Sequence, residues 1–144
     1  MKKKILVLGC NYNQVPYINE LRKRYFIIGC DKNNDAPGKN FVDIFYTCAY
    51  DNLEKLKKIC KSNNDIEEIF SASSQFSIIG VSYCKKILKK KPLKDSVCQI
   101  ILDKKKFYQY LKKKNINFPK TFIIKNKKDL EIRKKSELNF FFKI

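Results

Sequence analysis

The feature that most constrains the fold of this chain is a pair of short apolar runs whose starts lie about twenty residues apart. The runs, 5–10 and 25–30, are continuously apolar, as is typical of strands buried on both faces of a sheet. Between them, apolar side chains recur at helical spacing, with Pro16 in the position of a first helical turn. This separation is too long for a hairpin and matches a βαβ crossover, so we predict two parallel strands joined by a helix.

The same alternation continues to about residue 88. A loop rich in Asn, Asp, Pro and Gly is expected at 32–40, and Asp51 is the expected N-cap of the helix that follows the third strand. This order predicts an α/β fold with a Rossmann-like open parallel sheet and helices on both faces. The further elements expected are strands at 44–48 and 66–70 and helices at 53–63 and 76–88.

The chain changes character from residue 93 onward. It ends within an apolar run, where a domain seldom ends because nothing beyond covers the run. We therefore predict a Rossmann-like domain over 1–92, followed over 93–144 by linker helices and the first part of an incomplete α+β domain. The elements expected in this second part are helices at 95–102, 104–114 and 128–135 and strands at 121–124 and 138–143.

Cysteine and histidine usage excludes several kinds of site. The six cysteines are widely spaced without a CxxC pair, and the 144 residues include no histidine. A structural zinc site and a Ser-His-Asp triad are therefore not expected, and we predict no metal site. The cysteines lie among apolar neighbours, which favours buried free thiols in a reducing compartment. Because no apolar run is long enough to span a bilayer and no signal peptide is recognisable, we expect a cytoplasmic protein with no membrane partner.

The net charge of +18 suggests an anionic partner, but its composition and distribution narrow the choice. Of the 32 basic residues, 29 are lysine, whereas arginine is the residue that reads guanine and phosphate in a bidentate manner. Residues 1–84 carry a net charge of +3 and residues 85–144 a net charge of +15. Non-specific attraction to nucleic acid is conceivable through the second part, but the sequence does not favour base recognition.

In an open parallel sheet, ligands bind at the carboxyl ends of the strands. Three segments are expected there: 9–14 after the first strand, Asp31 after the second, and 71–75 after the fourth. Gly9 permits close approach of the backbone, but Asn11 and Gln14 stand where a dinucleotide fingerprint would have its other glycines. The sequence therefore does not favour binding of a dinucleotide such as NAD.

Taken together, these segments resemble the opening domain of the ATP-grasp ligases, a family that includes biotin carboxylase, carbamoyl-phosphate synthase and the phosphoribosyl-glycinamide and aminoimidazole ligases. The similarity extends over essentially the whole chain. It rests on the order and spacing of several short segments rather than on one motif. These segments are Ile5–Gln14, Cys30-Asp31, Asp35–Gly38, Phe41–Asp43, Ser71–Ser74, Asp103-Lys104 and Asn117–Pro119.

The resemblance implies a pre-ATP-grasp domain, followed by the beginning of the ATP-grasp domain, and a cofactor set of ATP and Mg²⁺. Lys104 and Lys143 match the two family lysines that contact the nucleotide phosphates. The family's glycine-rich loop and its Glu and Asn ligands for two magnesium ions are absent from this chain, so we expect no catalytic residue in it and no turnover by it alone. The residues expected to face the substrate are Asn11, Asn13, Asp31, Ser73 and Ser74.

The leading hypothesis is that the chain is the N-terminal portion of an ATP-grasp carboxylate–amine or carboxylate–thiol ligase. Its partners would be ATP and a small carboxylate. A first alternative is a non-catalytic module that binds nucleotide or polyanion, or a subunit of a split ligase, paired through an open sheet edge with a second copy or with a complementary ligase fragment. A second alternative is a non-specific nucleic-acid binder.

Overall fold

The computed structural model describes residues 2–72, 74–119, 124, 126–128 and 131. The chain divides into two compact units, 1–102 and 103–144, and each is described by itself. The first unit therefore continues ten residues beyond the domain boundary expected after residue 92 and includes the helix that follows it. The elements expected at 121–124, 128–135 and 138–143 lie wholly or mostly outside the described residues.

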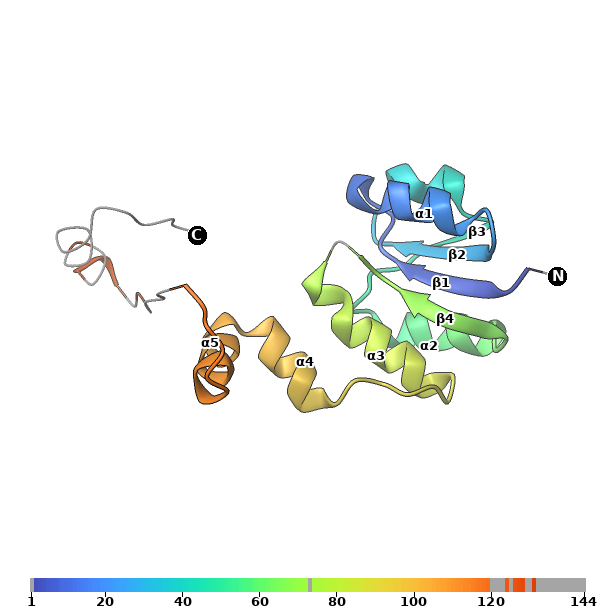
Figure 1. Cartoon of the computed structure of the whole chain (residues 1–144). Helices are drawn as coiled ribbons and strands as arrows, with labels where there is room; N and C mark the ends of the chain where they lie inside the picture. Colours follow the sequence, from blue (N-terminus) through green and yellow to red (C-terminus); the bar gives the residue numbers. More distant parts are fainter. Residues whose placement is uncertain (1, 73, 120–123, 125, 129–130, 132–144) are drawn as a thin grey trace. The chain divides into compact units, whose positions relative to one another are not determined.

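The first unit is built on a sheet of four parallel strands in the order β3-β2-β1-β4 (Figure 1). The central pair is in register along its length, with Ile5 opposite Ile27 and Leu8 opposite Cys30. The predicted α/β class and Rossmann-like parallel sheet are confirmed. The strands are β1 (Lys4–Leu8), β2 (Phe26–Asp31), β3 (Ile44–Thr47) and β4 (Ile66–Phe70).

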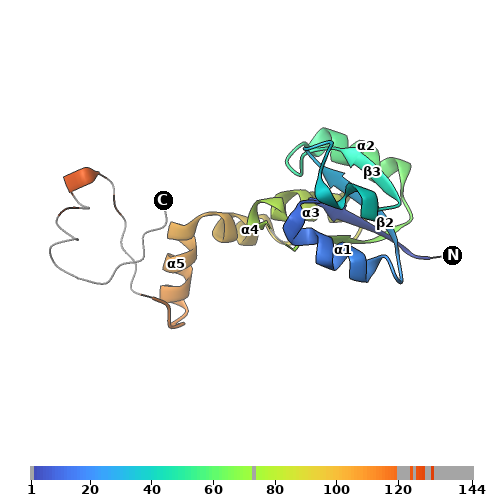
Figure 2. The same ribbon diagram turned by 90° about the horizontal axis from the view of Figure 1, so that it is seen from above.

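Helices cover both faces of this sheet. Figure 1 shows α1 on one side and α2 and α3 on the other, and Figure 2 shows the same layers from above. No helix among the described residues is long and apolar enough to cross a membrane. The α-helices are α1 (Val15–Leu21), α2 (Leu53–Ser62), α3 (Ile78–Ile87), α4 (Asp95–Leu102) and, in the second unit, α5 (Lys104–Lys113). The 3₁₀ turns are η1 (Tyr12–Gln14), η2 (Pro37–Phe41) and η3 (Gln75–Ser77).

The continuous apolar character of β1 follows from burial on both faces. Alternate residues of a strand point to opposite sides, so Leu6 and Leu8 enter the core beneath α2 and α3, while Ile5 and Val7 enter the core beneath α1. All six cysteines are free and buried, as predicted. Four of them lie together in the first of these cores: Cys30, Cys48, Cys60 and Cys84.

Two local predictions differ from the structure. The N-cap of α2 is Asn52 rather than Asp51: its side-chain oxygen accepts a hydrogen bond from Lys55 N at 3.1 Å. The predicted loop at 32–40 contains the start of η2, because Pro37 supplies a helical φ at the first position of a short turn. Helix boundaries of this kind depend on which polar side chain reaches the first free amides, and composition alone does not decide it.

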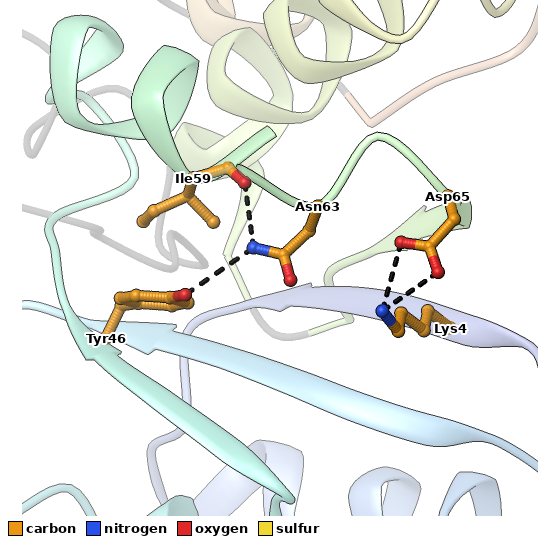
Figure 3. Close-up of polar contacts among 5 residues, drawn as sticks. All are labelled: Lys4, Tyr46, Ile59, Asn63 and Asp65. Carbon is orange, nitrogen blue, oxygen red and sulfur yellow. Dashed lines mark hydrogen bonds and ion pairs between the residues drawn. The ribbon is translucent and has the colours of Figure 1, made fainter. Parts of the chain in front are cut away.

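Polar contacts hold the segment between α2 and β4 in place (Figure 3). Lys4, at the start of β1, forms an ion pair of 2.8 Å with Asp65, which precedes β4. The buried Asn63 amide at the end of α2 donates to Ile59 O at 3.0 Å and to the Tyr46 hydroxyl at 3.5 Å. These contacts fix the return of the chain from α2 into β4.

The ion pair of Asp65 makes a testable contribution to stability. Its hydrogen bond with Lys4 lowers the pKa of the Asp65 carboxyl below its ordinary value of 3.8. A depressed folded-state pKa means that the contribution is present above the unfolded value and is lost as the pH falls through the folded value. We expect Asp65→Asn to lower the thermal midpoint slightly at neutral pH and to leave it unchanged well below 3.8.

The matched control is Asp51→Asn, because Asp51 is also exposed and its carboxylate forms no ion pair among the described residues. Thermal melts of both variants across the acid range provide the measurement. A loss of stability by Asp65→Asn that persisted at the lowest pH would show that the charge pair is not its cause.

Candidate functional site

A pocket of about 310 Å³ lies where strands β1 and β2 end, beside the loop that follows β4. This is the carboxyl edge of the sheet, at which parallel α/β folds bind ligands. The direction in which successive strands are added to the sheet reverses between β1 and β4. The pocket is lined by Leu8, Gly9, Asn11, Gln14, Asp31, Lys32, Asn33, Ala36, Pro37, Tyr50 and Ser74.

Gly9 turns the chain out of β1 and into the floor of this pocket. Its φ of +92° is a backbone conformation that residues with a side chain rarely adopt. The Gly9 amide donates to Cys30 O at 2.7 Å, which holds the turn against the end of β2. A Cβ added here would lie 2.4 Å from Gln14 Nε2, so the glycine is required both by its dihedral angle and by its neighbour.

Gln14 is the buried polar residue of the site, and it was not among the predicted site residues. Its side chain is fully buried; Nε2 donates to Leu8 O at 2.9 Å, and Oε1 accepts from Ala72 N at 3.2 Å. The amide thus joins the end of β1 to the loop after β4. The sequence carries no distinct signal for this role, because Gln14 ends a polar run, 11–14, in which only the folded structure shows which side chain is buried with both ends paired.

Asp31 ends β2, and its carboxylate ties two loops together. Oδ2 accepts from Cys10 N at 2.7 Å, and Oδ1 accepts from Asn33 N at 2.9 Å. Charge-assisted bonds of this kind are about twice as strong as neutral ones. Asp31 lines the pocket as expected. Its two hydrogen bonds also hold the loop after β1 beside the loop after β2.

The serine-rich loop after β4 is anchored by its own hydroxyl groups. Ser71 Oγ donates to Leu8 O at 2.8 Å, and Ser77 Oγ bonds both Ser71 Oγ at 2.8 Å and Ser74 O at 2.6 Å. Ser74, whose backbone carbonyl belongs to this network, lines the pocket. Ser73, also expected to face the substrate, lies outside the described residues.

The structure brings together three of the predicted substrate residues: Asn11, Asp31 and Ser74 line the same pocket. Asn13 is exposed and is not among the lining residues. Lys104 begins α5 and belongs to the second unit, whereas this pocket lies in the first. Lys143 lies outside the described residues.

Besides Gln14, residues Lys32, Asn33 and Tyr50 line the pocket without having been predicted as site residues. Lys32 and Asn33 follow directly after β2, in the segment interpreted as a loop. Because they directly follow the end of a strand, their positions could have indicated a role in the site, as the position of Asp31 did. Tyr50 precedes α2 and reaches the pocket through tertiary packing, for which the sequence offers no local indication.

Cys10 lies beside the pocket but is not suited to act as a nucleophile. Burial first, and the Asp31 carboxylate second, raise the pKa of the Cys10 thiol to about 12. The thiol therefore stays protonated at neutral pH, and the thiolate is the reactive form. Among the described residues, no group of three or more His, Cys, Asp or Glu side chains is arranged to hold a metal ion. The pocket can therefore bind a ligand through hydrogen bonds and through the charged side chains of Asp31 and Lys32.

No family model and no curated protein matches this chain. Solved structures do match: phosphoribosylglycinamide synthetase from Anaerococcus prevotii at a TM-score of 0.67 and 18% identity, with 94% of this chain and 35% of that chain covered. N5-carboxyaminoimidazole ribonucleotide synthetase from Thermotoga maritima matches at 0.64 and 18%, with 92% and 36% covered. N5-carboxyaminoimidazole synthetase from Staphylococcus aureus, complexed with ADP, matches at 0.66 and 15%, with 94% and 36% covered.

The chain spans about a third of the length of each of these structures. At this level of identity the similarity concerns the fold, and it agrees with the parallel sheet and flanking helices described above. This chain therefore shares its fold with part of each of these three synthetases.

Proposed function

We propose that this chain is the N-terminal portion of an ATP-grasp carboxylate–amine or carboxylate–thiol ligase. The observation that carries the proposal is the combination of the shared fold with a polar pocket at the carboxyl edge of the sheet. The sequence resemblance at 30–31, 35–38 and 71–74 supports the proposal as well, since Asp31, Ala36, Pro37 and Ser74 from these segments line the same pocket. Because fold alone does not imply function, the proposal depends on the chemistry of the pocket and of α5.

The substrate site is proposed to be the pocket lined by Asn11, Asp31 and Ser74. Gln14 and Asp31 hold the three surrounding loops in fixed positions through their hydrogen bonds to backbone groups. A site preorganised in this way loses little entropy when a small ligand binds. Its volume of about 310 Å³ suits a small metabolite.

The nucleotide is proposed to contact Lys104 at the beginning of α5. The Asp103 side chain caps this helix by accepting from Lys106 N at 3.1 Å, and Lys104 is exposed in the first helical turn. Lys104 has no ion pair among the described residues, so its ammonium fits a polyphosphate. Lys143 remains a second proposed contact, outside the described residues.

In a complete enzyme of this kind, ATP supplies a γ-phosphoryl group to a substrate carboxylate, and an amine or thiol then displaces the phosphate. Magnesium neutralises charge in such a transfer. In this proposal no catalytic step is assigned to this chain. Its proposed contributions are to hold the substrate and to bind nucleotide phosphates.

The test is nucleotide binding by the 144-residue chain. We expect Lys104→Ala to weaken ADP binding about tenfold, the effect of losing one charge-assisted contact. Lys112→Ala is the matched control, because it removes an equally exposed lysine from the other end of α5. Isothermal titration calorimetry at constant ionic strength provides the measurement, and phosphate release from ATP should stay at the level of buffer alone.

Equal weakening by both variants would indicate diffuse attraction to the lysine-rich surface, and the proposed nucleotide role of Lys104 would be wrong. Phosphate release by the purified chain above the buffer rate would contradict the assignment of no catalytic step to it.

A further inference from the structure

We propose that the pocket holds its ligand by an anionic group, a carboxylate or a phosphate, and that Lys32 is the residue that binds this group, with Asn33 beside it. The inference rests on the proposed function in treating the pocket as the substrate site, and it adds the residue that recognises the anionic group of the ligand. Neither lysine assigned to the nucleotide is involved.

Asp31 is the only acidic side chain among the described residues that line the pocket. Each of its carboxylate oxygens already accepts a backbone amide, from Cys10 at 2.7 Å and from Asn33 at 2.9 Å. Part of its negative charge is thus satisfied by fixed donors within the protein. A cationic ligand would have to share these oxygens, so Asp31 does not define the pocket as a cation site.

Lys32 lines the pocket and is exposed. Among the described residues, no carboxylate forms an ion pair with its ammonium group and no acceptor is hydrogen-bonded to it. Other lysines of this unit are engaged: Lys4 and Lys85 each contact an acidic side chain. The ammonium of Lys32 is therefore an available positive charge at the pocket, and it belongs to a backbone segment held in place by Asp31.

One hydrogen bond defines the orientation of the Asn33 side-chain amide. Its Oδ1 accepts the Asp35 amide at 3.0 Å. Since a backbone N–H can only donate, this bond identifies the oxygen and leaves the side-chain NH₂ group as a donor. Ser74 lines the same pocket. The side chains of Lys32, Asn33 and Ser74 carry an ammonium, an amide NH₂ and a hydroxyl, which are donors suited to the oxygens of an anion.

The experiment uses the ¹⁵N-labelled full chain, titrated separately with inorganic phosphate and with malonate at constant ionic strength. We expect saturable amide shifts confined to residues 9–14, 31–36 and 74 in at least one titration. Lys32→Ala should weaken that binding tenfold or more, and Lys32→Arg should restore most of it because the positive charge is retained. The matched control, Lys58→Ala, removes an exposed lysine from α2 that does not line the pocket.

The comparison of phosphate with malonate identifies which anion the pocket prefers. Shifts that never saturate, or that Lys32→Ala and Lys58→Ala reduce equally, would overturn the inference, because general attraction to a chain of net charge +18 would explain them. An amide spectrum of Lys32→Ala that retains the native pattern ensures that lost binding does not reflect lost folding. ADP binding through Lys104 is measured separately, so the proposed nucleotide role can fail while anion binding at Lys32 persists, or the reverse.

Discussion

Gly9→Ala is expected to destabilise the first unit by about 2–4 kcal/mol, the cost of a strained backbone together with a steric clash. The φ of Gly9 is +92°, and a Cβ at this position would lie 2.4 Å from Gln14 Nε2. Either the turn after β1 must change its dihedral angles or Gln14 must leave its place between Leu8 and Ala72. Both responses alter the pocket, so weaker binding of any pocket ligand should accompany the loss of stability.

Urea unfolding followed by circular dichroism measures the effect of Gly9→Ala. Asn13→Ala serves as the control from the same loop, because Asn13 is exposed and should change the unfolding free energy by no more than about 0.5 kcal/mol. If Gly9→Ala proved as stable as the parent chain, the left-handed turn and the close contact with Gln14 could not both be present in solution.

Gln14→Ala is expected to cost about 2–4 kcal/mol through a cavity and two lost hydrogen bonds. The side chain is fully buried, so its removal leaves space that neighbouring atoms fill only in part. Ala72 N loses its acceptor, and Leu8 O loses one of two side-chain donors, the other being Ser71. The loop after β4 should loosen, with faster hydrogen exchange at Ala72 as a second measurement.

Gln109→Ala is the matched control, because it truncates an exposed glutamine of α5 and should leave stability unchanged. The double variant Gly9→Ala/Gln14→Ala separates the two causes. Since the clash at Gly9 involves Gln14, the double variant should be less destabilised than the two single changes imply. Strict additivity would mean that the two residues do not contact each other in the folded protein.

Much of the sheet could be predicted because a strand that is buried on both faces consists of a continuous run of apolar residues. The run at 5–10 and the run at 25–30 correspond to β1 and β2, and the helix between them forces the parallel connection. The predicted strand at 66–70 and helix at 95–102 have the boundaries seen in the structure. In each case the pattern is local and repeats within one element, so neighbours along the chain suffice to indicate it.

The candidate site could be predicted only in part, because its residues meet through tertiary contacts. Asn11, Asp31 and Ser74 were expected at strand ends and share one pocket. Asn13 has the same local context as Asn11, yet it is not in the pocket wall. Which side of a short turn faces the ligand depends on dihedral angles that composition does not specify.

Four features could be inferred from the order of the amino acids: the α/β class, the parallel order of connection, the burial of the cysteines and the segments that reach the carboxyl edge of the sheet. Each of these depends on periodicity or on the positions of strand ends. Three further points required the folded chain: Gln14 joins two loops, Asp31 accepts from Cys10 and Asn33, and Lys32 lines the pocket. A polar side chain acquires its role from the partners that folding brings within hydrogen-bond distance, and Ala72, a partner of Gln14, lies 58 residues away in the chain.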